Sequence, residues 1–122
     1  MEAWRQSWRA IQSLLSRQAL TALRAGLMSG DVRLVQGRTI EPAPIPLNAD
    51  LAPTGADPIA YAFWLGEGLE TVSEIEEAWY ALTHYASVNL GEPAGVKWFL
   101  NWWDDTPAQQ ARLAVLAEVE AE

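Results

Sequence analysis

His84 is the single histidine of this chain and the side chain best suited to general acid–base chemistry near neutral pH. Helical spacing places it near Glu77, Tyr80 and Val88, away from the apolar face expected for the same helix. Such a patch can transfer protons, but no partner nucleophile lies within reach in the sequence. We therefore interpret His84 as an exposed, hydrogen-bonded side chain. A small hydrolase or metal-dependent enzyme that uses His84 and nearby carboxylates stays open as an alternative.

Carboxylates that could bind a hard metal ion form two groups, at residues 70–77 and 104–105. Such a site requires several converging ligands, and no loop has the D-x-D-x-D-G spacing of an EF-hand. The helix dipole favours acids in the first turn of a helix, which explains these positions without a metal. Because phosphate-binding glycine loops and catalytic motifs are also missing from the sequence, we expect neither a metal nor a cofactor. The acids considered are Glu70, Glu74, Glu76, Glu77, Asp104 and Asp105.

Tryptophan is the most informative residue type, with seven in a chain of 122 residues. Residues 96–107, VKWFLNWWDDTP, contain three of them directly before two aspartates and a proline. On a helix, the apolar side chains of residues 96–103 cover an arc of about 200°, whereas a helix on one side of a core needs little more than about 100°. This helix is therefore either enclosed by the rest of the domain or in contact with a second chain.

We expect the indoles to divide between a core and a surface patch, because seven exceed what a core of this size readily encloses. Four or five indoles, among them Trp64, Trp79 and Trp103, are assigned to the core, and one or two of Trp4, Trp8, Trp98 and Trp102 to the surface. Burial of all seven among the helices is the alternative. Exposed tryptophan is typical of binding hot spots, since its rigid ring buries a large area and keeps one N–H donor. Carbohydrate binding is a further alternative that would need two coplanar exposed rings. The residues from which we expect a partner-binding patch with acidic surroundings are Trp4, Trp8, Trp98, Trp102, Asp104 and Asp105.

Composition indicates one globular domain, residues 1–122, with an uneven distribution of charge. Half of the residues are hydrophobic and the net charge is −8. Residues 1–40 contain six arginines against two acids, whereas residues 41–122 contain 14 acids against two basic residues. This negative field repels phosphates, so we expect no direct binding of nucleic acid. The basic N-terminal helix can still contact a phosphate, or it can pair with the acidic remainder of the chain.

The sequence has no signal peptide and no run of about 18 apolar residues, so we expect no association with a membrane. It also has no cysteine, which fits a reducing compartment and excludes a disulfide framework. We therefore expect a cytoplasmic location.

The elements of the N-terminal half are a long helix, an extended segment and a proline-rich connector. Residues 2–28 predict a helix whose apolar stripe changes direction, so it has two neighbours or bends near residues 16–18. Residues 32–40, VRLVQGRTI, predict a small β-hairpin or an extended arm. Residues 41–58 hold most of the prolines and predict a partly polyproline connector that wraps the surface.

The C-terminal half predicts four more helices from their start and stop signals. Asp57 followed by Pro58 is typical of a helix start and precedes a short helix over 59–65. Capping boxes at 73–76 and 106–109 predict starts for a helix over 74–90 and for a last helix to about residue 121. The tryptophan-rich helix lies between them. The apolar face expected for the 74–90 helix comprises Ile75, Ala78, Trp79, Leu82, Tyr85, Ala86 and Leu90.

These elements give a mainly α fold class, with five helices, a short β-hairpin and a proline-rich arm packed across them. Two segments carry a resemblance to a known family. Residues 61–69, YAFWLGEGL, are similar to an element that begins near C-x-x-G-A-L, and residues 103–107, WDDTP, to a W-N-D-x-P-G-R-T signature before a last helix. The chain thereby resembles a family of small uncharacterised bacterial and phage proteins, although it has no cysteine, has Asp104 in place of asparagine and lacks the Gly-Arg-Thr. The resemblance implies a fold and no activity.

The function that we predict is a non-enzymatic protein–protein interaction module that binds a protein partner or forms a homodimer through the tryptophan patch. An acidic, phage-type inhibitor that imitates nucleic acid is an alternative, which predicts acids clustered on one exposed face and salt-sensitive binding. The enzyme that uses His84 is the other alternative, and it requires His84 on a pocket floor beside converging acids.

Overall fold

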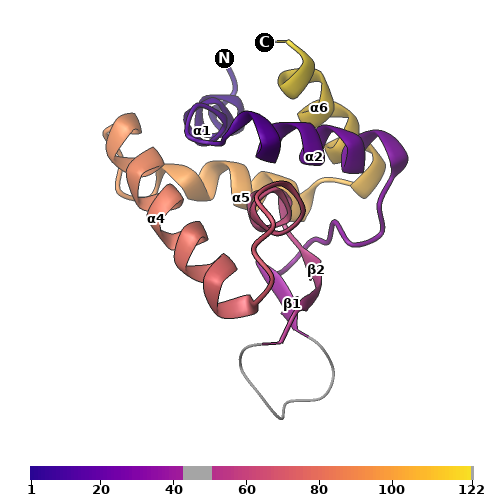
Figure 1. The fold of residues 1–122 in the computed structure, drawn as a ribbon. Helices are drawn as coiled ribbons and strands as arrows, with labels where there is room; N and C mark the ends of the chain where they lie inside the picture. Colours follow the sequence, from indigo (N-terminus) through magenta and orange to yellow (C-terminus); the bar gives the residue numbers. More distant parts are fainter. Residues whose placement is uncertain (43–50, 122) are drawn as a thin grey trace.

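A computed structural model describes residues 1–42 and 51–121 of the chain. Within these residues, six α-helices, one π-helical turn and a two-stranded antiparallel sheet form a mainly α architecture with a minor β part (Figure 1). None of the described helices is both long and apolar enough to cross a membrane. The elements are α1 Ala3–Gln12, α2 Arg17–Ser29, β1 Ile40–Pro42, β2 Pro53–Ala56, α3 Pro58–Tyr61, η1 Ala62–Gly66, α4 Val72–Leu90, α5 Gly95–Asp105 and α6 Ala108–Glu120.

The long N-terminal helix expected over residues 2–28 is two helices, α1 and α2, separated by a break at residues 13–16. Ser16 begins α2 because its hydroxyl accepts a hydrogen bond from the amide of Ala19 at 3.1 Å. The break follows from the change in direction of the apolar stripe. Two separate helices can each turn their own apolar side chains to the core, Trp4 and Trp8 on α1 and Leu23 on α2. The expected bend is therefore a break.

The hairpin expected within residues 32–40 is wrong, because the sheet pairs β1 with the more distant β2, with Ile40 opposite Ala56. Residues 32–39 form the extended arm that was the other expectation, and Leu34 makes an isolated parallel bridge to Ala56. The amide of Val35 donates to the carbonyl of Ala56 at 2.9 Å. Of the proline-rich connector, residues 43–50 lie outside the described residues, and its Pro53–Ala56 part is a strand.

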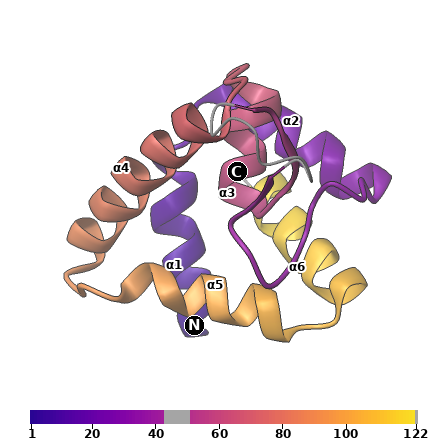
Figure 2. The ribbon, with the colours of Figure 1, turned by 90° about the horizontal axis from the view of Figure 1, so that it is seen from below.

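The short helix α3 lies at the centre of the fold and continues directly into the π-helical η1 (Figure 2). Asp57 begins it as predicted, because its carboxylate accepts a hydrogen bond from the amide of Ala60 at 2.8 Å and Pro58 occupies the first helical position. α2 packs closely against this segment. A Cβ atom at Gly66 would overlap the backbone of Ala19, so the close approach requires glycine.

Helix α4 begins two residues earlier than the predicted capping box at residues 73–76 allows, and that box is wrong. Thr71 is the actual N-cap: its hydroxyl accepts from the amide of Glu74 at 3.3 Å and contacts the Glu74 carboxylate at 2.9 Å. The T-x-x-E pattern at 71–74 satisfies the same rule as S-x-x-E at 73–76, so local sequence alone does not separate them. The expected stop is confirmed, because Gly91 ends the helix with φ of 69°.

The predicted capping box at residues 106–109 is also wrong. The Thr106 hydroxyl donates to the carbonyl of Trp102 at 2.6 Å, and α6 begins after Pro107 without a side-chain cap. The Thr106 hydroxyl therefore bonds a free main-chain carbonyl at the end of α5 and does not cap the amides at the start of α6.

Two ion pairs join α6 to the N-terminal helices. Arg9 pairs with Glu118 at 2.9 Å and Arg24 with Glu120 at 2.9 Å. The basic N-terminal part thus pairs with acids from the C-terminal part, as the charge distribution predicts.

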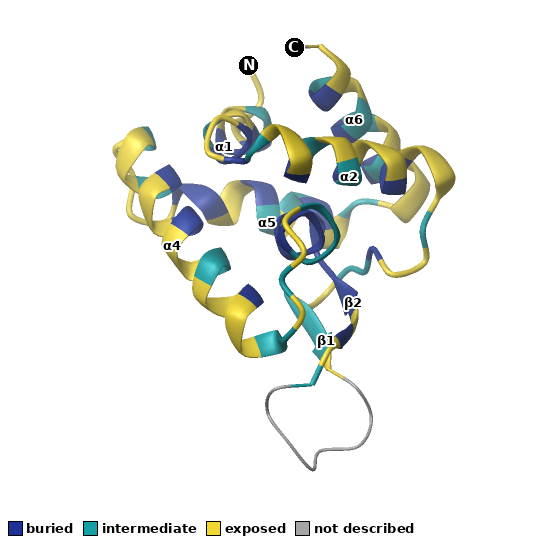
Figure 3. Cartoon of the chain, viewed as in Figure 1, coloured by how far each residue is buried: buried dark blue, intermediate teal, exposed yellow. Residues whose placement is uncertain are grey.

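Buried side chains line the inner faces of all six helices, whereas α4 presents a broad exposed surface at the edge of the molecule (Figure 3). Its 19 residues form the longest helix described. α1, α3, η1 and α5 contact its inner side. On the opposite side of α4, most side chains are exposed, and no element of the described part of the chain packs there.

Candidate functional site

The indoles expected at a surface patch form part of the core between α1 and α5. Trp8 and Trp103 are fully buried, and Phe99 lies beside the Trp8 ring with centroids 4.8 Å apart. Both indole N–H groups are satisfied, because Trp8 donates to the Gln12 side chain at 2.6 Å and Trp103 donates to the carbonyl of Val35 at 2.9 Å. The assignment of Trp8 to a partner-binding patch is therefore wrong, whereas that of Trp103 to the core is confirmed.

Trp4 and Trp102 lie face to face, with ring centroids 3.7 Å apart and planes 5° apart. Trp4 is buried, and its N–H donates to the Glu2 carboxylate at 2.9 Å, so its place in an exposed patch is also wrong. The Arg5 guanidinium lies 5.0 Å from the Trp4 ring centroid. The two rings are parallel and cover each other's faces. A carbohydrate site needs two coplanar rings that are both exposed, and this pair does not provide them.

The other members of the expected patch are scattered along α5. Trp102 is half-buried, and Trp98, one turn earlier on the same helix, is 36% exposed. Asp104 accepts a hydrogen bond from the amide of Gly37 at 2.8 Å and so holds the extended arm, whereas Asp105 is exposed. Of the six residues, the structure brings only Trp4 and Trp102 into ring contact, and Trp98 is the only exposed indole among the described residues.

The two other indoles assigned to the core, Trp64 and Trp79, are half-buried, and each contacts a polar side chain. The Trp79 N–H donates to the buried carboxylate of Asp57 at 3.1 Å. Trp64 lies under the guanidinium of Arg33, 5.4 Å from the ring centroid. Both rings therefore lie at the boundary of the core and not at its centre.

Asp57 is a buried carboxylate at the junction of β2, α3 and α4. Burial raises the pKa of Asp57 to about 7, and the nearby charge of Asp104 adds to this. The hydrogen bonds that the carboxylate accepts from Ala60 and Trp79 act in the opposite direction but are outweighed. Since both oxygens are satisfied by these donors, we assign Asp57 to the structure of the helix start.

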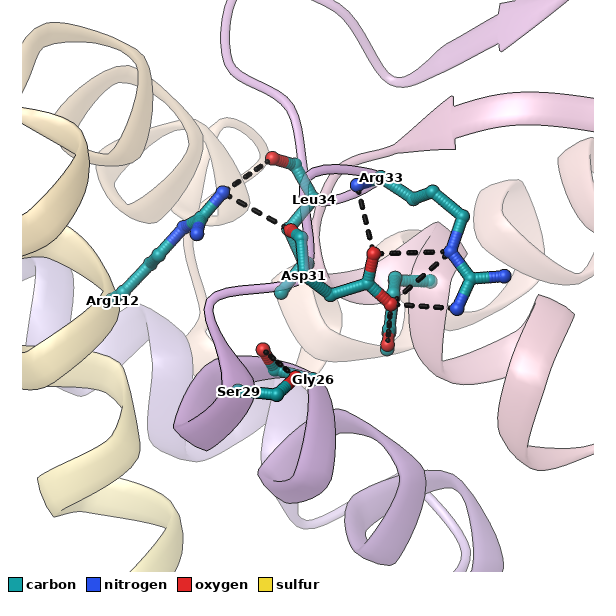
Figure 4. A network of polar contacts seen from close by, with 7 residues as sticks. Gly26, Ser29, Asp31, Arg33, Leu34 and Arg112 are labelled. Carbon is teal, nitrogen blue, oxygen red and sulfur yellow. Dashed lines mark hydrogen bonds and ion pairs between the residues drawn. The ribbon is translucent and has the colours of Figure 1, made fainter.

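A second polar network lies around Asp31, between the extended arm, α3 and α6 (Figure 4). Its carboxylate accepts hydrogen bonds from Arg33 and from the Tyr61 hydroxyl, each at 2.7 Å. Arg112 donates to the main-chain carbonyls of Asp31 and Leu34, each at 3.1 Å. The Arg33 guanidinium lowers the pKa of Asp31 well below its ordinary value, and burial raises the pKa of Tyr61 to about 12. The network fixes the arm to the helices.

Exposed apolar side chains gather instead on the outer side of α4. Tyr80 is 65% exposed, and Tyr85 and Val88 are each 60% exposed. Ala81 and His84 lie between them and are also exposed. We name this surface the α4 ridge and define it as Tyr80, Ala81, His84, Tyr85 and Val88.

A shallow apolar groove of about 310 Å³ runs along one side of the α4 ridge. Its walls come from α4, from η1 and from the break between α1 and α2. The side chains that line it are Leu14, Phe63, Ala78, Ala81, Leu82 and Tyr85.

Sequence reasoning missed this surface because Tyr85 was assigned to the apolar face of the helix. Tyr85 shares a side of α4 with Ala78 and Leu82, but nothing among the described residues covers it. One feature of the sequence indicates this surface: Tyr80 and Val88 lie outside the predicted apolar face and are nevertheless apolar.

His84 lies on the α4 ridge at the border of a second cavity, about 300 Å³, between α4 and α5. The residue is exposed as predicted, and its ring meets the edge of Tyr85 with centroids 5.6 Å apart. Lys97 and Ser87 also line this cavity, but no Asp or Glu does, so the converging acids required for the enzyme alternative are not found there. Among the described residues, no group of three or more His, Asp or Glu side chains could hold a metal ion.

Comparisons with known proteins assign no family to this chain: no family model matches it, and no curated protein or solved structure matches it either. The resemblance to the bacterial and phage family stays a prediction.

Proposed function

We propose that this chain is a protein-binding module that contacts its partner through the α4 ridge and the apolar groove beside it. The observation that carries the proposal is the exposure of Tyr80, Tyr85 and Val88 on one continuous side of α4. A contiguous exposed apolar surface is unfavourable in water and is typical of a surface that another protein covers. The groove adds a concave apolar strip on which a partner can exclude water from Tyr85 and Leu14.

The residue types on the ridge support a protein partner. Tyrosine is enriched in protein interfaces because its ring buries a large area while its hydroxyl keeps a hydrogen bond to water or to the partner. Both ridge tyrosines are held on a regular helix, so little conformational entropy is lost when they are covered. Trp98 lies on α5 outside this groove and is at most an additional contact.

A partner other than a second copy fits this surface better. A two-fold dimer places the same surface patch of each copy against that of the other. Helix α4 contains no lysine or arginine, so the same patch of a second copy offers Glu74 and Glu77 no basic partner. The homodimer predicted from the tryptophans stays a prediction, which sedimentation of the purified protein tests.

The acidic inhibitor is a second candidate, and the exposure of five glutamates near the start of α4 favours it. Such an inhibitor would bind through carboxylates alone. It therefore predicts that removing Tyr85 leaves partner binding unchanged. The glutamates are Glu67, Glu70, Glu74, Glu76 and Glu77.

Site-specific photo-crosslinking in cells that naturally produce the protein tests the proposed function. A photoreactive phenylalanine analogue at Tyr85 should give a discrete crosslinked product, because the ridge is covered by the partner. The same analogue at Gln110, an exposed position on α6, is the matched control and should give none. Equal yields at the two positions, or a product only from an analogue at Trp98, would contradict the proposed surface.

A further inference from the structure

The groove beside the α4 ridge has apolar walls and an acidic border, and the two features together indicate the chemistry of its occupant. All six lining side chains are apolar apart from the Tyr85 hydroxyl. Leu14 and Tyr85 form the outer edges, and both are exposed. The floor contains Leu82 and Phe63, which are buried by their own neighbours. A row of apolar side chains from a partner would therefore meet apolar surface along the whole groove.

The segment of the chain that leads up to the groove residues of α4, residues 67–77, contains five exposed carboxylates. Glu74 and Glu77 are on α4 itself, one turn before groove residues, and Glu67 and Glu70 lie in the connection from η1. None of these, nor Glu76, forms an ion pair with a described residue. The sequence has no lysine or arginine from residue 39 to residue 96, so neither α4 nor the connection from η1 contains one that could compensate these charges. The border consequently attracts cations.

The form of the occupant follows from what the walls offer. The groove is bounded by helices whose amides and carbonyls bond internally, so it has no free strand edge to which an extended peptide could add by main-chain hydrogen bonds. The β1–β2 sheet, toward the lower end of the molecule in Figure 1, contacts α4 through β1, but none of its residues lines the groove. A helix that packs alongside α4 at the usual interaxial distance of about 8–10 Å places a stripe of side chains in such a groove.

We propose that the groove beside the α4 ridge binds a basic amphipathic helix of a partner protein, with its apolar stripe against Leu14, Leu82 and Tyr85. Its lysines or arginines lie against the glutamates at the start of α4. This inference rests on the proposed function, since it names the partner of the same surface. The arginines of the chain's own α1 and α2 do not make a second copy the occupant. Three of the four are paired within the chain, Arg5 with Glu2, Arg9 with Glu118 and Arg24 with Glu120, and one remaining arginine is too few for a basic stripe.

Two synthetic peptides test this directly. Both carry leucines at helical i, i+3, i+4 and i+7 spacing over about 14 residues, which spans about 20 Å. One has lysines on its flanks and the other has glutamates at the same positions. In isothermal titration with the full chain, the lysine peptide should bind at least tenfold more tightly than its acidic twin. Its affinity should fall as salt is raised.

Variants of the full chain separate the two contributions. Glu74→Gln together with Glu77→Gln should reduce the preference for the lysine peptide at least threefold. Tyr85→Ala should weaken the lysine peptide at least tenfold at every salt concentration. Asp105→Asn, which removes an exposed charge from α5, is the matched control and should leave both affinities unchanged.

Equal affinity for the two peptides, or no binding of either, would overturn the inference. An unchanged preference for the lysine peptide in the Glu74→Gln, Glu77→Gln variant would also overturn it. The same holds if Tyr85→Ala leaves the affinity for the lysine peptide unchanged, which is the result expected of an acidic mimic. The proposed function fails separately, when the photoreactive residue at position 85 gives no specific product. If position 85 gives a specific crosslinked product but the chain does not prefer the basic peptide, the proposed protein-binding surface stands. Only the proposal of a basic helix as its partner then fails.

Discussion

The contact between α1 and α5 and the outer surface of α4 are both rich in aromatic side chains, but they differ in what covers those side chains. Trp8 and Phe99 are enclosed by neighbouring helices, and the indole N–H of Trp8 has a partner in Gln12. Tyr80 and Tyr85 have packed helices on one side only and are largely exposed. The comparison shows that the abundance of indoles serves the fold, whereas the smaller number of tyrosines on α4 is available for recognition.

Replacement of Trp8 by alanine should have the largest effect on stability. It removes a fully buried ring and leaves the Gln12 side chain without its partner, so we expect the free energy of unfolding to fall by about 3–5 kcal/mol. Chemical denaturation followed by circular dichroism measures it. Trp98→Ala is the matched control on the exposed side of α5 and should cost less than about 1 kcal/mol. Similar losses for the two variants would remove the distinction between the regions.

The buried carboxyl of Asp57 should make stability depend on pH. The folded state keeps its proton up to about pH 7, whereas the unfolded chain releases it near the ordinary pKa of 3.8. The folded state thus binds more protons between these values, so the free energy of unfolding should fall as pH rises from about 4 to about 7 and then level off. Its slope is at most about 1.4 kcal/mol per pH unit.

Asp57→Asn checks that assignment, because asparagine does not titrate and should flatten the slope. His84→Gln, a substitution at an exposed position on α4, is the control and should leave the slope unchanged. Asp31 affects stability in a lower pH range. Because Arg33 lowers its pKa, Asp31 adds to the free energy of unfolding above about pH 4, and this contribution is lost as pH falls below that value. An unchanged slope between pH 4 and 7 in Asp57→Asn would show that this carboxyl is ionised in the folded state.

The close contact of η1 with α2 should respond to a single methyl group. A Cβ atom at Gly66 would overlap the backbone of Ala19, which cannot rotate away. We expect Gly66→Ala to lower the free energy of unfolding by about 1–3 kcal/mol, measured by chemical denaturation. Gly68→Ala serves as the neighbouring control, since a Cβ there meets nothing within 4 Å and only its φ of 73° opposes the change. Equal stability of Gly66→Ala and the parent would mean that the two elements are farther apart.

Sequence patterns predicted the elements where the determinants are local. The start at Asp57 and Pro58 and the stop at Gly91 depend on one or two residues and are confirmed. The pairing of Ile40 with Ala56 depends on contacts between distant segments, and local β patterns instead predicted a hairpin around Gly37. Thr106 shows the same limit, because its hydroxyl can bond in either direction and the end of α5 provides the nearer acceptor.

The candidate site was less accessible from sequence than the fold. Residue type placed His84 correctly on an exposed surface, but it could not show which indoles are covered. Trp4 is buried because Trp102 lies flat against it, whereas no helix within residues 1–42 and 51–121 covers Tyr85. Helical periodicity gives the direction of a side chain, whereas burial depends on whether another element occupies that direction.

The most direct test of the account is the affinity of the Tyr85→Ala variant for the protein captured by crosslinking at position 85, measured on samples whose unfolding curves are also recorded. We predict that the free energy of unfolding stays within about 0.5 kcal/mol of the parent, because the ring is largely exposed. The affinity should fall at least tenfold, as expected when an aromatic anchor is removed. An unchanged affinity, or a loss of stability large enough to explain the loss of binding, would contradict the assignment of recognition to α4.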